Sequence, residues 1–201
     1  MLDVYSKVFP HSILAANIKA CNVFRLCEDK KAALDVIETS CDRKAMADNA
    51  FIQQNTAVFE AGQKAFKVLP DLLEKVPEAK LNLAIYYLRQ NEVEAAAELL
   101  QSVEAVSPQS HALIGVLNTQ LGQARQNPEL LTKAMSHFQT AGSSPADADT
   151  ILGRQCMASY LMLLKEYENA LVYLGRMFIL CDQVLKRRHT NILCNISPFI
   201  H

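Results

Sequence analysis

Side chains that could carry out chemistry are scattered along this 201-residue chain. Five histidines stand far apart in the sequence, at His11, His111, His137, His189 and His201, and there is no HExxH metal-binding motif. The GxSxG, GxxxxGKS and GxGxxG motifs of hydrolases and nucleotide-binding proteins are also missing. We therefore expect His111 and His137 to be packed or half-exposed helix residues. No catalytic residue, metal ligand or cofactor is predicted.

The cysteines also form no motif. They are Cys21, Cys27, Cys41, Cys156, Cys181 and Cys194, and no two of them make a CxxC pair. The N-terminus lacks the basic start and apolar run of a signal peptide. The longest apolar runs fall well short of the roughly 18 residues that cross a bilayer. We expect free thiols in a reducing compartment, with disulfides or metal ligation as the alternatives.

Charged side chains do not point to a site either. Glu92 and Glu94 fall in a predicted turn, and Glu94 and Glu98 share a solvated helix face, which argues against paired catalytic carboxylates. The basic run from Lys186 to His189 is interpreted as a solvated tail, the alternatives being nuclear targeting or phosphate contact. With a net charge of -1, the chain shows no bias toward nucleic acid or membranes. No nucleic acid, membrane insertion or small-molecule substrate is expected.

The elements that position these side chains are predicted to be helices. Half of the residues are hydrophobic, glycine and proline are few, and no segment alternates as a strand would. The clearest segment is 77–108, where small residues stand at positions 8 and 20 and large ones at positions 11 and 24, counted from Pro77. A proline follows at position 32. This spacing is typical of a tetratricopeptide repeat, a hairpin of two amphipathic helices.

The same spacing recurs in five predicted hairpins. The small residues of the first helices are Cys21, Ala50, Ala84, Gly115 and Ala158, and those of the second helices are Ala33, Gly62, Ala96, Ala134 and Ala170. Large residues that fill the space between helices include Tyr87, Leu100, Phe138 and Leu174. Paired small residues are 12 apart in four hairpins, but Gly115 and Ala134 are 19 apart, which indicates a longer turn or an extended first helix.

The predicted fold is an all-α tetratricopeptide-repeat solenoid of about five helical hairpins, wound as a right-handed superhelix. Residues 1–13 are expected to be a ragged start or the remnant of a preceding helix. Residues 14–177 form the solenoid, and residues 178–201 form an atypical tail, because the spacing of small and large residues fails there and no polar capping helix is recognisable.

A partner-binding groove is the predicted functional feature, because the first helices of stacked hairpins line a concave wall. Its candidate residues are Ile18, Asn22, Arg25, Glu78, Leu81, Ile85, Leu88, Arg89, Gln155, Ser159 and Met162. The mixture of apolar and polar side chains suits protein recognition, whereas a nucleic acid would call for a basic stripe. The apolar strip of Leu81, Ile85 and Leu88 is either a partner site or a seat for another piece of the same chain.

Three segments carry a more specific resemblance. Residues 16–26 (ANIKACNVFRL), residues 68–100 and residues 149–174, with the words PEAKLNLAIYYLRQ and GRQCMAS, resemble the intraflagellar transport protein 56 family. This resemblance extends over approximately residues 10–174. It implies a non-enzymatic scaffold or adaptor subunit of the intraflagellar transport B complex that supports cargo transport into cilia and cilium assembly. The alternative is a generic tetratricopeptide co-chaperone or assembly adaptor that binds peptide segments in its groove.

The resemblance also implies partners and a location. The partners would be other intraflagellar transport B subunits and ciliary cargo proteins, and the location would be the cilium and the cytoplasm around the basal body. Family members are expected to be longer, so the chain is expected to be truncated at both ends. Residues after Leu174 depart from the expected repeats, and a splice end or a gene-model artefact in 178–201 is one hypothesis for them.

Overall fold

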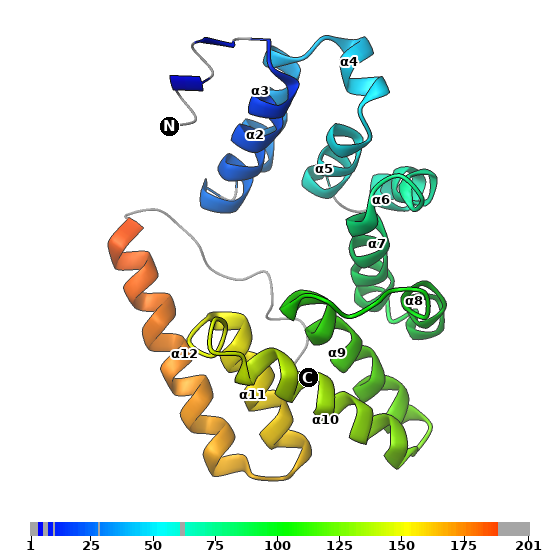
Figure 1. Ribbon diagram of the computed structural model, residues 1–201, viewed down its shortest axis with the longest axis vertical. Coiled ribbons are helices and arrows are strands. Elements are labelled where there is room, and N and C mark those ends of the chain that lie inside the picture. The colour runs from blue at the N-terminus through cyan, green and yellow to red at the C-terminus, as the bar shows by residue number, and fades with distance from the viewer. Residues whose placement is uncertain (1–3, 6–7, 10, 28, 61–62, 189–201) are drawn as a thin grey trace. The chain divides into compact units, whose positions relative to one another are not determined.

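The computed structural model describes residues 4–5, 8–9, 11–27, 29–60 and 63–188, and within these residues it contains helices and no strand (Figure 1). The elements are α2 (Ile13–Cys27), α3 (Lys30–Ser40), α4 (Arg43–Asp48), α5 (Ala50–Glu60), α6 (Gln63–Val68), η1 (Leu69–Leu72), α7 (Pro77–Arg89), α8 (Val93–Leu100), α9 (Pro108–Ala124), α10 (Pro128–Ser143), α11 (Ile151–Leu163) and α12 (Tyr167–Arg188). Consecutive helices pack in pairs, which confirms the predicted all-α repeat fold.

The chain divides into two compact units. The first contains the residues up to Tyr86, and the second runs from Tyr87 to Arg187. The division falls within α7. Each unit is described by itself.

In the first unit, small residues on facing helices let α2 and α3 approach closely. Ala16, Ala20 and Ala33 are at most 5% exposed. Larger side chains fill the remaining space, and the ring of Phe24 on α2 lies 4.6 Å from the ring of Phe59 on α5. An N-cap starts α3, because the Asp29 carboxylate accepts a hydrogen bond from the Ala32 amide at 2.9 Å.

In the second unit, the same use of small residues brings α10 against both α9 and α11. Ala134, Phe138 and Ala141 on α10 pack in one buried cluster with Cys156 on α11. Gly115 on α9 faces the Phe138 ring, where a side chain would have no room. Burial of apolar surface at these crossings is the main stabilising contribution to the unit.

Three hairpins turn in the same way. The turns 90–92, 125–127 and 164–166 each place their middle residue at positive φ: 62° for Asn91, 50° for Gln126 and 63° for Lys165. In the first turn, the Glu92 amide donates to the Tyr87 carbonyl at 2.9 Å and the Asn91 amide to the Leu88 carbonyl at 3.1 Å. The other two turns repeat both hydrogen bonds. This pattern is the Schellman motif, which satisfies the last carbonyls of a helix and ends it.

The fourth hairpin is longer because both of its helices are extended. Helix α7 ends five residues after Ala84, whereas α9 ends nine residues after Gly115. Helix α8 begins three residues before Ala96, whereas α10 begins six before Ala134. The four and three added residues account for the surplus of seven, and the turn keeps its length. The predicted extension of the first helix is therefore half of the explanation.

Most of the small and large residues that define the repeats are buried. At most 5% of the residue is exposed for Ala33, Ala84, Ala96, Leu100, Ala134, Phe138, Ala158 and Ala170, and Gly115 is buried as well. Cys21, Tyr87 and Leu174 are half-buried. Gly62 lies outside the described residues.

The second hairpin differs from its predicted register. We expected its first helix to begin near Arg43, but that segment is a short helix, α4, and a separate helix, α5, begins at Ala50. Ala50 is only half-buried. The buried small residues of this hairpin are Ala57 and Ala65, at 2% and 0% exposed. Ala57 lies seven residues after Ala50, two helical turns further along the same face.

The predicted boundary between the solenoid and the tail does not coincide with a break between helices. The boundary between residues 177 and 178 falls inside α12, which continues to Arg188. Side chains of 178–188 and all of 189–201 lie outside the described residues. At the other end, α2 begins at Ile13, next to the predicted start of the solenoid.

Candidate interaction surface

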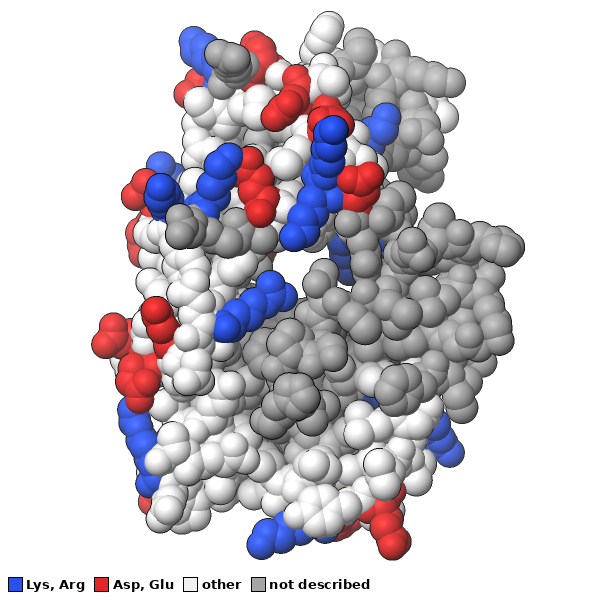
Figure 2. Space-filling view, turned by 180° about the vertical axis from the view of Figure 1, so that it is seen from behind, with Lys and Arg blue, Asp and Glu red and all other residues white. Residues whose placement is uncertain are grey.

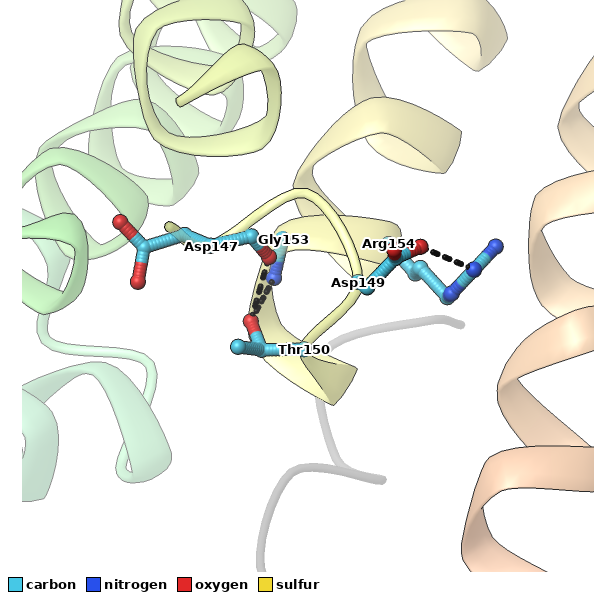
Figure 3. A network of polar contacts seen from close by, with 5 residues as sticks. All are labelled: Asp147, Asp149, Thr150, Gly153 and Arg154. Atoms are coloured by element: carbon cyan, nitrogen blue, oxygen red, sulfur yellow. Dashed lines mark hydrogen bonds and ion pairs between the residues drawn. The ribbon is translucent and has the colours of Figure 1, made fainter. Parts of the chain in front are cut away.

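The connection between α10 and α11 fixes the position of α11, which carries three candidate groove residues. Thr150 is the N-cap: its hydroxyl oxygen accepts from the Gly153 amide at 3.0 Å and donates to the Asp147 carbonyl at 2.7 Å (Figure 3). The Arg154 guanidinium pairs with Asp149 at 2.5 Å. A Cβ on Gly153 would lie 2.0 Å from the Asp147 carbonyl oxygen. Glycine at this position therefore allows the loop to pack directly on the helix.

The candidate groove residues on helix α11 are most exposed toward the C-terminal end of the helix. Gln155 and Ser159 are half-buried, and Met162 is 45% exposed. The side-chain oxygen of Gln155 has no hydrogen-bond partner within the described residues, and the same holds for Gln120 on α9. A polar atom without a partner costs stability unless a ligand or water satisfies it. Both oxygen atoms are buried, so their capacity to accept a hydrogen bond is unmet among the described residues.

All three candidate groove residues on helix α2 are exposed. Ile18 is 42% exposed, and Asn22 and Arg25 are exposed as well. The neighbouring face of the same helix is held by Asn17, which accepts a hydrogen bond from the Asn55 side chain at 2.8 Å. This contact ties α2 to α5 and leaves the face that carries Ile18 open.

Helix α7 contributes less open surface than we expected. Glu78 is exposed, while Leu81 and Ile85 are half-buried. Leu88 is only 5% exposed, so it is a packing residue and our assignment of its side chain to an open groove was wrong. For Leu88 the alternative interpretation, packing against another part of the same chain, describes the structure better. Arg89, at the end of the helix, is exposed.

The structure brings together two histidines that we had interpreted separately. Nδ1 of His111 on α9 lies 3.0 Å from Nδ1 of His137 on α10, with both side chains half-buried. Burial lowers the pKa of His137, and the nearby His111 lowers it further. Each histidine lies within about one helical turn of the Gly115–Phe138 crossing, and this hairpin geometry was the available signal for their contact.

The three cysteines whose side chains the structure describes are not activated for chemistry. Cys21, Cys41 and Cys156 are free thiols. Burial raises the pKa of Cys21 and of Cys41, and it raises the pKa of Cys156 to about 11. A thiol in this state is a poor nucleophile because little thiolate is present near neutral pH. No group of three potential metal ligands occurs among the described residues.

Charges on the surface are mixed in sign. On the face shown in Figure 2, acidic and basic side chains are interspersed rather than gathered into a single basic stripe. Glu94, one of the carboxylates considered above, pairs with Arg125 at 3.2 Å in the second unit, with both side chains more than half exposed. Such an exposed pair contributes little to stability. No helix in the part of the chain described is both long and apolar enough to span a bilayer.

Comparison with known proteins identifies the family to which this chain belongs. A model of the family described as intraflagellar transport protein 56 matches residues 1–189. The chain belongs to the intraflagellar transport protein 56 family. The match takes in residues 178–189, so this part of the predicted atypical tail lies within the sequence pattern of the intraflagellar transport protein 56 family, and our expectation that the pattern stops near residue 174 was wrong.

A curated relative in the intraflagellar transport protein 56 family is also similar. The intraflagellar transport protein 56 homolog of Caenorhabditis elegans is 29% identical over 192 residues, which covers 87% of this chain and 33% of the relative. The chain thus spans about a third of the length of the curated relative it matches.

Proposed function

We propose that this chain is part of a non-enzymatic scaffold or adaptor subunit of the intraflagellar transport B complex. The observation that carries the proposal is the family match over residues 1–189 on a chain built from packed helical hairpins. Its partners would be other intraflagellar transport subunits and ciliary cargo proteins. It would act in the cilium and in the cytoplasm around the basal body, in support of cargo transport and cilium assembly.

The surface chemistry supports binding rather than catalysis. Helical hairpins expose their first helices to partners. In the described residues these helices carry mixed apolar and polar side chains, such as Ile18 with Arg25 on α2 and Met162 with Ser159 on α11. The pKa shifts resolved for the cysteines hold these thiols protonated, which disfavours thiolate chemistry.

The test is a pull-down of the tagged chain from ciliated cells, followed by mass spectrometry. Recovery of intraflagellar transport subunits supports the proposal, whereas recovery of heat-shock chaperones alone favours the co-chaperone alternative. A groove variant, Met162→Glu, places a charge on the exposed part of α11 and should reduce recovery. The matched control is Lys133→Glu, an exposed position on α10. Equal recovery with both variants would count against α11 as a partner surface.

A further inference from the structure

One face of α2 carries an exposed stripe that changes from apolar to basic along its length. Leu14, Ile18, Asn22 and Arg25 follow one another at separations of four, four and three residues, so they lie on one side of the helix. Leu14 is 64% exposed and Ile18 is 42% exposed. Arg25 stands in the last turn, and Lys19 flanks Ile18.

The charge on this surface is of one sign. Helix α2 contains Lys19 and Arg25 but no acidic residue. Neither cation forms an ion pair with a carboxylate of the described residues, although ion pairs elsewhere in the first unit join Lys64 to Glu60 and Lys80 to Glu74. The two cations therefore remain available to a partner.

An open depression lies in the segment that precedes α2 in the chain. Tyr5, Val8, Phe9, His11 and Ser12 line this depression of about 430 Å³. Val8 and Phe9 are 64% and 54% exposed, and the Tyr5 and Phe9 rings lie 4.9 Å apart. A space of this size accommodates a large apolar side chain, which is how helical ligands anchor in grooves.

We propose that the α2 stripe, from Leu14 to Arg25, docks an acidic amphipathic helix of a partner protein. That helix would lie along the stripe over roughly 16 Å, or three turns, with its apolar face against Leu14 and Ile18 at one end. Its carboxylates would meet Lys19 and Arg25, so that charge fixes the direction in which the helix lies. This inference rests on the proposed function and names the chemistry of one partner.

Two other occupants fit the stripe less well. A membrane-bound amphipathic helix needs a broad apolar face, whereas this stripe is one side chain wide and the opposite side of α2 is packed through Ala16 and Ala20. A second copy of the same stripe, related by a two-fold axis, would bring the same cations and no carboxylate. The second copy therefore leaves Arg25 without an opposite charge, and the membrane finds too narrow an apolar face.

The test uses the whole chain with a photoreactive leucine analogue at Leu14, expressed in ciliated cells and irradiated. Mass spectrometry then identifies the peptide attached at that position. The expected peptide has apolar residues at helical spacing and a net negative charge. The analogue placed instead at Glu38, exposed on α3, should not capture that peptide.

Two charge variants test whether the cation at Arg25 contributes to the yield of the peptide captured at Leu14. Arg25→Glu should lower the yield of the captured peptide about fivefold, since it replaces attraction by repulsion. Lys31→Glu removes an exposed cation from α3 and should leave the yield unchanged. Both residues are exposed, and unchanged thermal melting of both variants verifies the fold.

Several outcomes overturn the inference. These are a basic peptide, a lipid, another part or copy of this chain at Leu14, the absence of any captured peptide, or a yield that ignores Arg25→Glu. The pull-down described above separates this failure from failure of the proposed function. If transport subunits are recovered while Leu14 captures no acidic helix, the adaptor function stands and the docking site does not.

Discussion

Gly115 on α9 lies so close to Phe138 on α10 that a Cβ at residue 115 would sit 2.7 Å from the Cε1 atom of the ring. The ring cannot withdraw easily, because Phe138 is only 4% exposed and packs with Ala134 and Ala141. A hydrogen atom at residue 115 is therefore what allows this large aromatic side chain to fill the crossing of the two helices.

Replacing Gly115 by alanine should destabilise the chain. Overpacking of a filled core costs about 1–3 kcal/mol, which exceeds the gain in helix propensity of roughly 0.5–1 kcal/mol. Chemical denaturation measures the difference. Gly175→Ala is the matched control, because no atom lies within 4 Å of its added Cβ, and this variant should be slightly stabilised. Equal effects of the two substitutions would show that Gly115 is not at a close crossing.

Gly153→Ala should cost more than Gly115→Ala. The added methyl group would meet the backbone carbonyl of Asp147 at 2.0 Å rather than a side chain, so the loop before α11 would have to move. We expect a loss of about 3 kcal/mol or more in unfolding free energy. Ser159→Ala, half-buried on the same helix, serves as the control. A smaller loss than that of Gly115→Ala would mean that the loop yields easily.

Gln126→Gly should stabilise the chain by up to about 1 kcal/mol. Gln126 has a φ of 50°, a conformation that costs non-glycine residues energy and glycine very little. Gln123→Gly makes the same chemical change three residues earlier, inside α9, and should destabilise by about 0.5–1 kcal/mol. The two thermal midpoints should shift in opposite directions. Shifts in the same direction would contradict the turn conformation.

Stability should fall on acidification because His137 is partly buried and lies beside His111. Burial lowers the pKa of His137 below its ordinary value of 6.5, and His111 lowers it further. The unfolded chain then binds a proton more readily than the folded chain. The contribution of neutral His137 to the stability of the folded state is fully present above pH 6.5. It is lost as the pH falls through the pKa of His137 in the folded state. Helix α9 carries no other ionisable side chain, while α10 adds Glu129 and Lys133.

Denaturant midpoints at several pH values between 7.5 and 5 measure this dependence. His137→Gln should flatten the curve over the window below 6.5, since it removes the proton-binding group. His11→Gln, at an exposed position, should leave the curve unchanged. An identical slope for the parent chain and His137→Gln would assign the dependence to other groups.

The sequence identified the hairpins but not every register. Ala84 with Ala96, and Ala158 with Ala170, are buried as their spacing predicts. In the second hairpin the choice of Ala50 was wrong because Ala50 and Ala57 stand two helical turns apart on one face. Periodicity alone does not distinguish such registers. Only packing against α2, through Phe59 and Ile52, selects the second one.

Contacts between hairpin helices were harder to predict than the helices. A separation of 19 residues between Gly115 and Ala134 is compatible with a longer turn or with a longer helix. Which of the two forms depends on whether the added residues of α9 and α10 pack against each other. The same holds for His111 and His137, whose contact follows from the relative rotation of α9 and α10. The groove residues remain a prediction, apart from Leu88, whose burial no residue pattern within α7 indicated.

The buried thiols of Cys41 and Cys156 have a practical consequence. Cys41 lies in the first unit and Cys156 in the second, at 9% and 2% exposed. A protonated, enclosed thiol reacts with an alkylating reagent only when its surroundings open. Labelling each cysteine over time, with peptides resolved by mass spectrometry, therefore measures the opening of each unit separately, and no cysteine has to be introduced for it.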